Sequence, residues 1–174
     1  SQKTPPTVQQ TKATVKTPTS EPVIPTVKYK YLSDPKDLFD IYKTLTTIEQ
    51  KIIKIGALVW ETVLYSKIAE IYNGVFTVVR GIEPLSSVQV KVHLTKLAQI
   101  GFFKDERAGQ YRINTVFAEY LCENNWHTDN ELRIVISTIQ NRVTMYPSNL
   151  SDRFFRDLRM AFYQGYIDSF KQQF

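Results

Sequence analysis

The sequence is poor in cysteine and histidine. Of its 174 residues only Cys122 is a cysteine, and the two histidines are His93 and His127. One cysteine cannot form a disulfide within the chain, and so few soft ligands argue against a structural zinc site. We therefore expect no metal and no other cofactor, and we expect a reducing, intracellular compartment.

Glycine is also scarce, and its six copies are scattered along the chain. The sequence has no glycine cluster of the kind that cradles phosphate, no Gly-x-Ser-x-Gly nucleophile elbow and no paired metal ligands. These absences argue against an enzyme. We expect no catalytic residue and no small-molecule substrate.

Long apolar runs are missing as well. A membrane-spanning helix needs about 18 or more consecutive apolar residues, and the sequence contains no such stretch. The chain opens with Ser-Gln-Lys-Thr-Pro-Pro, unlike a secretory leader with its basic start and apolar core. Both observations predict a soluble protein that contacts no membrane and is not exported.

Positive charge is concentrated at the N-terminus. The net charge is +5, and residues 1–30 contain five lysines and a single acid, Glu21, which leaves +1 for residues 31–174. Five of the eight prolines also lie in the first 25 residues, among Thr, Lys, Gln and Ser. This composition predicts a disordered tail over residues 1–28. The tail is either a solvated linker or a weak basic arm for phosphates or a partner.

Capping signals predict two helices at the start of the body. A proline-opened first turn at Ser33–Leu38 begins a helix that ends near Lys43. Thr46 and Glu49 form a Ser/Thr-x-x-Glu capping box, and the isoleucines that follow cover a wide helical face. This pattern predicts a main helix over about residues 47–61.

A shorter helix is predicted next. Ser66 can cap it, and Asn73-Gly74 can end it. The β-branched segment Val75–Val79 that follows is either a short strand or an extended loop.

The clearest helix covers about residues 85–100. Ser86 and Gln89 occupy the capping-box positions, and Leu85 and Val90 occupy those of a hydrophobic staple. An apolar stripe at 3-4-4 spacing consists of Val90, Leu94, Leu97 and Gly101. The opposite face is polar, with lysines and no carboxylate. Such a face can hydrogen-bond to base edges or phosphates.

A β-hairpin is predicted after this helix. Gly101-Phe-Phe-Lys ends the helix and begins a strand, Arg107-Ala-Gly-Gln forms a turn, and Tyr111-Arg-Ile-Asn forms the returning strand. The run from Val90 to Asn114 resembles the recognition helix and wing of winged helix-turn-helix proteins. It is similar to bacterial ArsR- and PadR-like repressors and to the C-terminal winged helix of Orc/Cdc-type replication initiators.

The resemblance implies a fold and a function. The fold is mainly α with a small β-hairpin (α+β): a winged helix over residues 29–124 with additional N- and C-terminal helices. The function is binding of double-stranded DNA in transcription regulation or replication initiation, with the helix in the major groove and the wing on phosphates. The implied contacts are Ser86, Gln89, Lys91, Val92, Thr95 and Lys96 on the helix and Lys104, Arg107 and Arg112 on the wing.

Other features favour a protein partner. About twelve residues, Gly74–Leu85, separate the short predicted helix after Ser66 from the predicted helix over residues 85–100, where helix-turn-helix proteins use three or four. The body is nearly neutral, and Asp105 and Glu106 lie beside Arg107, so DNA binding has to depend on local charge. The alternative function is a protein–protein contact within a larger chromatin or replication assembly. His93 is expected to be a partly buried neighbour of the core with no accompanying carboxylate.

Residues 125–174 are predicted to form a helical pair for packing or dimerisation. Thr128-Asp-Asn-Glu is a capping box for the first helix, and Ser151 can cap the second. Along one face of the second helix, apolar residues form a stripe at 3-4-4-4 spacing: Phe155, Leu158, Phe162, Tyr166 and Phe170. Aromatics are enriched in interface cores, so the stripe either binds a second copy or a protein partner, or completes the core. The arginines Arg153, Arg156 and Arg159 are expected to form a solvated face.

Overall fold

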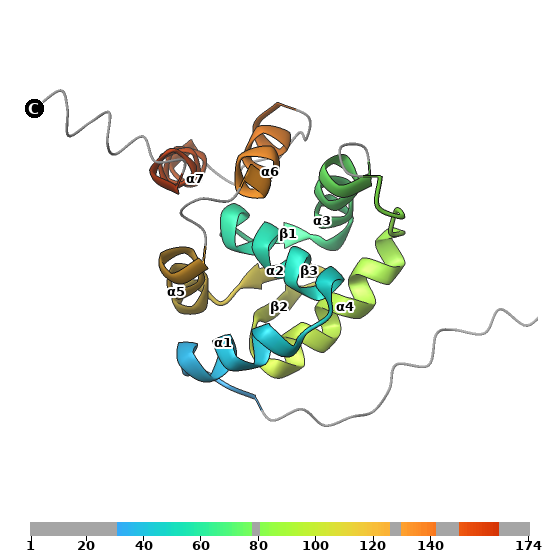
Figure 1. Ribbon diagram of the computed structural model, residues 1–174, viewed down its shortest axis with the longest axis vertical. Helices are drawn as coiled ribbons and strands as arrows, with labels where there is room; N and C mark the ends of the chain where they lie inside the picture. Colours follow the sequence, from blue (N-terminus) through green and yellow to red (C-terminus); the bar gives the residue numbers. More distant parts are fainter. Residues whose placement is uncertain (1–30, 78–80, 126–129, 142–149, 164–174) are drawn as a thin grey trace, which may run out of the picture.

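The computed structural model describes residues 31–77, 81–125, 130–141 and 150–163, and the predicted tail lies outside these ranges. The described residues are mainly helical, with one small antiparallel sheet (Figure 1). The helices are α1 (Pro35–Thr44), α2 (Thr47–Val59), α3 (Tyr65–Tyr72), α4 (Ser87–Ile100), α5 (Thr115–Asn125), α6 (Asn130–Asn141) and α7 (Leu150–Tyr163). The strands are β1 (Val63–Leu64), β2 (Phe103–Arg107) and β3 (Gln110–Ile113). The predicted α+β class is confirmed.

Helix α2 lies at the centre of these elements (Figure 1). The predicted capping box starts it: Thr46 Oγ1 accepts from Glu49 N at 3.3 Å, and Glu49 Oε2 accepts from Thr46 N at 3.1 Å. Its fully buried side chains are Ile52, Ile53, Ile55, Ala57, Leu58 and Val59. Apolar residues cover most of its circumference because α3, α4, α5, α7 and β3 all pack against it.

The sheet has the strand order β1-β3-β2, with β3 antiparallel to both neighbours. The hairpin β2–β3 is the predicted one, and Lys104 pairs with Arg112 across it. Strand β1, where Val63 pairs with Tyr111, was not predicted, because two residues are too few to show an alternating pattern. From α2 to β3 the chain therefore runs helix, strand, helix, helix, strand, strand.

Helix α3 begins earlier than predicted, and the chain stays helical beyond its end. The helix begins at Tyr65 after Leu64, which provides no side-chain cap, so the predicted cap at Ser66 is wrong. Asn73–Thr77 form a π-helical turn, so the strand or extended loop predicted from Val75 is wrong as far as Thr77, and Val78 and Val79 lie outside the described residues. Val75 and Phe76 are fully buried in that turn. A short apolar run does not reveal by its periodicity whether it is helical or extended.

Asn73 closes the long connection between α3 and α4. Its Nδ2 donates to the Leu85 carbonyl at 2.8 Å, and Leu85 N donates to Asn73 Oδ1 at 2.9 Å. The π-helical turn takes up part of Gly74–Leu85, and the two hydrogen bonds hold the start of α4 beside the end of α3. The long connection therefore does not separate the two helices, which pack against each other.

Helix α5 was not predicted, although a signal for it is present. Asn114 Oδ1 accepts from Phe117 N at 3.1 Å, which is the hydrogen bond of an N-cap. Its fully buried side chains are Phe117, Ala118, Leu121 and Cys122. The Phe117 ring lies 5.0 Å from that of Phe102 and 6.1 Å from that of Tyr42, measured between centroids. Helix α5 thus covers the core beside α1.

Helices α6 and α7 partly match the prediction. Helix α6 is present as predicted, and its side chains Val135, Ile136 and Ile139 are buried. Helix α7 begins at Leu150, so Ser151 lies inside the helix and is not its cap. The predicted cap at Thr128 lies outside the described residues.

Two arginines of α7 dock it against the end of α2. Arg156 is 7% exposed, and its Nη1 donates to Glu61 Oε1 at 3.0 Å. Arg159 stacks on Trp60, with 3.7 Å between the guanidinium carbon and the ring centroid. The predicted solvated arginine face is therefore wrong for both residues, while the side chain of Arg153 is not described. Met160 is buried beside them.

Candidate nucleic-acid interface on α4 and the hairpin

Caps and core contacts fix the position of α4. The predicted capping box is present: Ser86 Oγ accepts from Gln89 N at 3.2 Å, and Gln89 Oε1 accepts from Ser86 N at 2.8 Å. At the other end Gly101 has φ +120°, and a Cβ added there would overlap the Leu32 carbonyl oxygen. The predicted stripe is fully buried at Val90, Leu94 and Leu97. The opposite face of α4 therefore points away from the core.

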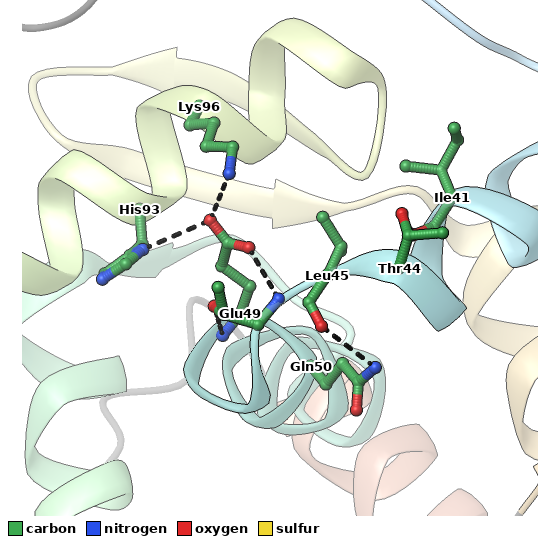
Figure 2. Close-up of polar contacts among 8 residues, drawn as sticks. Ile41, Thr44, Leu45, Glu49, Gln50, His93 and Lys96 are labelled. Carbon is green, nitrogen blue, oxygen red and sulfur yellow. Dashed lines mark hydrogen bonds and ion pairs between the residues drawn. The ribbon is translucent and has the colours of Figure 1, made fainter.

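Lys96, one of the predicted DNA contacts, forms an ion pair with Glu49 of α2 (Figure 2). The distance between Lys96 Nζ and Glu49 Oε1 is 2.6 Å, and the Glu49 side chain is only 2% exposed. Burial alone raises the pKa of the Glu49 carboxyl, but the hydrogen bonds from Lys96 and Thr46 outweigh it and hold this pKa below its usual value. The predicted DNA contact of Lys96 would have to compete with this buried carboxylate.

His93 approaches the same carboxylate (Figure 2). Its Nδ1 lies 3.5 Å from Glu49 Oε1, and the imidazole is 26% exposed. The prediction of a partly buried histidine is confirmed, but the expectation that no carboxylate accompanies it is wrong. The carboxylate comes from another helix, which sequence spacing could not reveal. Glu49 therefore contacts two side chains of α4.

Thr95 is joined to the hairpin. Its Oγ1 lies 3.1 Å from the Tyr111 hydroxyl and 2.9 Å from the Lys91 carbonyl oxygen, to which it donates. Tyr111 is 1% exposed, so the contact is at the edge of the core. Three polar side chains predicted to touch DNA, those of Ser86, Gln89 and Thr95, thus make hydrogen bonds within the chain.

Four predicted DNA contacts are exposed cations, namely Lys91, Lys104, Arg107 and Arg112. Lys91 Nζ lies 5.5 Å from the ring centroid of Tyr65, and Tyr65 N donates to the carbonyl of Gly109 in the hairpin turn at 3.1 Å. Lys91 and the hairpin turn therefore lie on the same side of the molecule. Lys104 is 3.6 Å from Glu106 in an exposed pair, which contributes little energy.

The outer face of α4 is apolar near its start. Val88 is 55% exposed, and Val92 one turn later is partly exposed. Val88, Val92, Thr95 and Gln99 share this face by helical spacing. Val92 was among the predicted contacts and Val88 was missed. The sequence could have predicted that Val88 is exposed, because it lies two residues before Val90 and is therefore off the buried stripe.

A groove of about 530 Å³ lies on another side of α4, where it meets α1 and α2. The lining residues are Leu32, Ile41, Thr44, Leu45, Thr46, Glu49, Lys96 and Ile100. Figure 2 shows Ile41, Thr44 and Leu45 to one side of the Lys96–Glu49 ion pair, and all five residues line the groove. Lys96 thus borders both this groove and the outer face of α4.

The exposed edge of α7 contains part of the predicted interface stripe. Phe155 is 58% exposed and Leu158 is 55% exposed, while Arg156 and Met160 face the core. The side chain of Phe162 is not described, and Tyr166 and Phe170 lie outside the described ranges. The two described exposed members of the stripe therefore each have more than half of their surface accessible.

Comparisons of this chain with protein-family models, with curated proteins and with solved structures found no match. Within the described ranges, no helix has the length and apolar character needed to cross a membrane. In the same part of the chain, no three His, Cys, Asp or Glu side chains come together as ligands for a metal ion.

Proposed function

We propose that this chain is a winged-helix module that binds double-stranded DNA in transcription regulation or replication initiation. In this proposal α4 enters the major groove, and the β2–β3 hairpin is the wing. The order α2, β1, α3, α4, β2, β3 and the strand order β1-β3-β2 support the proposal. So does the Asn73–Leu85 contact, which holds α3 and α4 together as a helix pair.

The observation that carries the proposal is the set of exposed cations on α4 and on the β2–β3 hairpin that packs against it. Lys91 lies on α4 itself, and Lys104, Arg107 and Arg112 lie on the hairpin. Lysine and arginine release counterions when they neutralise phosphates, and this release supplies most sequence-independent affinity for DNA. The helix dipole adds partial positive charge at the first turn of α4. The four cations and the start of α4 provide local positive charge for phosphates, although the net charge of residues 31–174 is low.

Fluorescence anisotropy with a labelled short duplex at low salt tests the proposal. We expect saturable binding, and we expect the double variant Arg107→Glu/Arg112→Glu to lose more than about tenfold in affinity. The matched control is Arg133→Glu, a charge reversal at an exposed position of α6. An absence of binding, or an equal loss in the hairpin variant and the control, would contradict the proposal.

A second candidate function is a protein–protein contact through α7, either with a second copy of this chain or within a larger assembly. The observation that favours it is the exposure of Phe155 and Leu158 on one edge of the helix, at 58% and 55%. Contiguous exposed apolar patches mark contact surfaces, and aromatic side chains are enriched in the cores of such surfaces. The two functions use different elements, so they can coexist.

A further inference from the structure

The outer face of α4 has few side chains available to read polar base edges. Ser86 and Gln89 form the helix cap, Thr95 bonds to Tyr111, and Lys96 pairs with Glu49. The exposed side chains of the first two turns are Val88, Gln89 and Lys91, and Val92 is partly exposed. If this face enters the major groove, apolar contact has to supply much of the discrimination between bases.

We infer that Val88 and Val92 contact the 5-methyl groups of thymine in the major groove. This inference rests on the proposed DNA binding and adds the chemical class of base that α4 reads. In the major groove, thymine is distinguished by its 5-methyl group, which apolar side chains contact. Val88 lies in the first turn of α4, and the first residues of recognition helices are those that reach base edges.

The charge around the two valines favours DNA over an apolar protein surface as the occupant. Lys91 lies on the same helix, and the hairpin with Lys104, Arg107 and Arg112 lies beside it. The sequence of α4, Ser87–Ile100, contains no carboxylate, so no acid on the helix repels the phosphates that border the groove. The exposed cations of α4 and the hairpin can meet the anionic walls of the groove, and the two valines can meet methyl groups on its floor. Asp105 of β2 borders Thr95 and Gln99 further along α4.

The test uses duplexes that differ in one methyl group per base pair. An alternating dA-dT duplex is compared with its dA-dU counterpart, and an alternating dG-dC duplex is compared with the same sequence containing 5-methylcytosine. We expect the wild-type chain to bind the methylated member of each pair more tightly. The expected ratio is about fourfold per contacted methyl, which corresponds to removing one methyl group from water.

The variants Val88→Ala and Val92→Ala assign the effect to side chains. Each is expected to bind both members of a pair more nearly equally, and the double variant is expected to lose the preference while retaining salt-sensitive binding. Val116→Ala on α5 is the matched control, because Val116 is 57% exposed, close to the 55% of Val88. The control is expected to keep the wild-type preference.

The outcomes separate the inference from the function on which it rests. Equal binding of methylated and unmethylated duplexes by the wild-type chain would contradict thymine contact and leave DNA binding intact. A methyl preference that persists in Val88→Ala/Val92→Ala would also contradict it, because DNA shape would then cause the preference. If no duplex is bound at low salt, both the inference and the proposed function are wrong.

Discussion

Lys96 Nζ lies 2.6 Å from Glu49 Oε1 and joins the middle of α4 to the first turn of α2. The carboxylate is 2% exposed and also accepts a hydrogen bond from Thr46 N. This contact acts together with the buried side chains of Val90, Leu94 and Leu97, which turn Val88 and Val92 outward. A lysine predicted to face the DNA groove is therefore also a positioning residue for the candidate interface.

The Glu49 carboxylate is expected to stabilise the fold in a pH-dependent way. Its pKa is lower in the folded chain than in the unfolded chain, where glutamate has a value of about 4.3. Its contribution is therefore fully present above the unfolded value and is lost as the pH falls through the folded pKa. We expect Glu49→Gln to lower the unfolding free energy at pH 7 by roughly 1–3 kcal/mol, measured by urea denaturation.

The same denaturation at about pH 3 and below provides the control. Protonation of Glu49 weakens its hydrogen bonds in the wild-type chain but leaves the glutamine variant unchanged, so the difference between the two should shrink. A difference that stays constant from neutral pH to acid would show that the charge of Glu49 does not stabilise the fold.

Substitutions of Lys91 and Lys96 are expected to have different effects on stability and on DNA binding. Lys96→Met removes the partner of a buried carboxylate and should lower the unfolding free energy by roughly 1–3 kcal/mol. Lys91→Met changes an exposed side chain and should shift stability by less than about 0.5 kcal/mol while weakening DNA binding severalfold. Urea denaturation measures the stability of both variants, and fluorescence anisotropy measures their affinity for duplex DNA. The opposite pattern would contradict these assignments.

Gly101 is expected to be required for the junction between α4 and β2. Gly101→Ala places a Cβ on the Leu32 carbonyl at a φ of +120°, so we expect a loss of roughly 2–4 kcal/mol in thermal or urea denaturation. Gly81→Ala is the matched control, since Gly81 also has a positive φ but nothing lies within 4 Å of its added Cβ. Gly81→Ala should lower the unfolding free energy by about 1 kcal/mol, which is the effect of backbone strain alone. Equal costs would indicate that the contact with Leu32 is unimportant.

The exposed edge of α7 is expected to mediate self-association. Phe155→Ser/Leu158→Ser removes two apolar side chains that are more than half exposed, so the fold should retain its stability within about 1 kcal/mol. Sedimentation velocity over a range of concentrations is expected to show dimer for the wild-type chain and monomer for the variant. Val116→Ser on α5 is the control for a similarly exposed apolar side chain. A wild-type chain that stays monomeric at high concentration would argue against this use of α7.

Local signals in the sequence predicted the local structure well. The capping boxes at Thr46–Glu49 and Ser86–Gln89 are both present, because a cap depends only on residues three apart. Strand β1 was missed because its two residues are defined by pairing with β3, which lies far along the chain. The Lys96–Glu49 ion pair was missed for the same reason. The sequence of α4 shows lysines on a polar face, but the carboxylate that pairs with Lys96 comes from α2, which lies far away in the sequence.

The salt dependence of duplex binding is the most direct test of DNA recognition by α4 and the hairpin. If Lys91, Lys104, Arg107 and Arg112 each neutralise one phosphate, log K should fall linearly with log salt concentration, with a slope of about −3 to −4. Arg112→Gln should make that slope less steep by about 1. A slope near zero, or no binding at the lowest salt concentration, would contradict DNA binding by this surface.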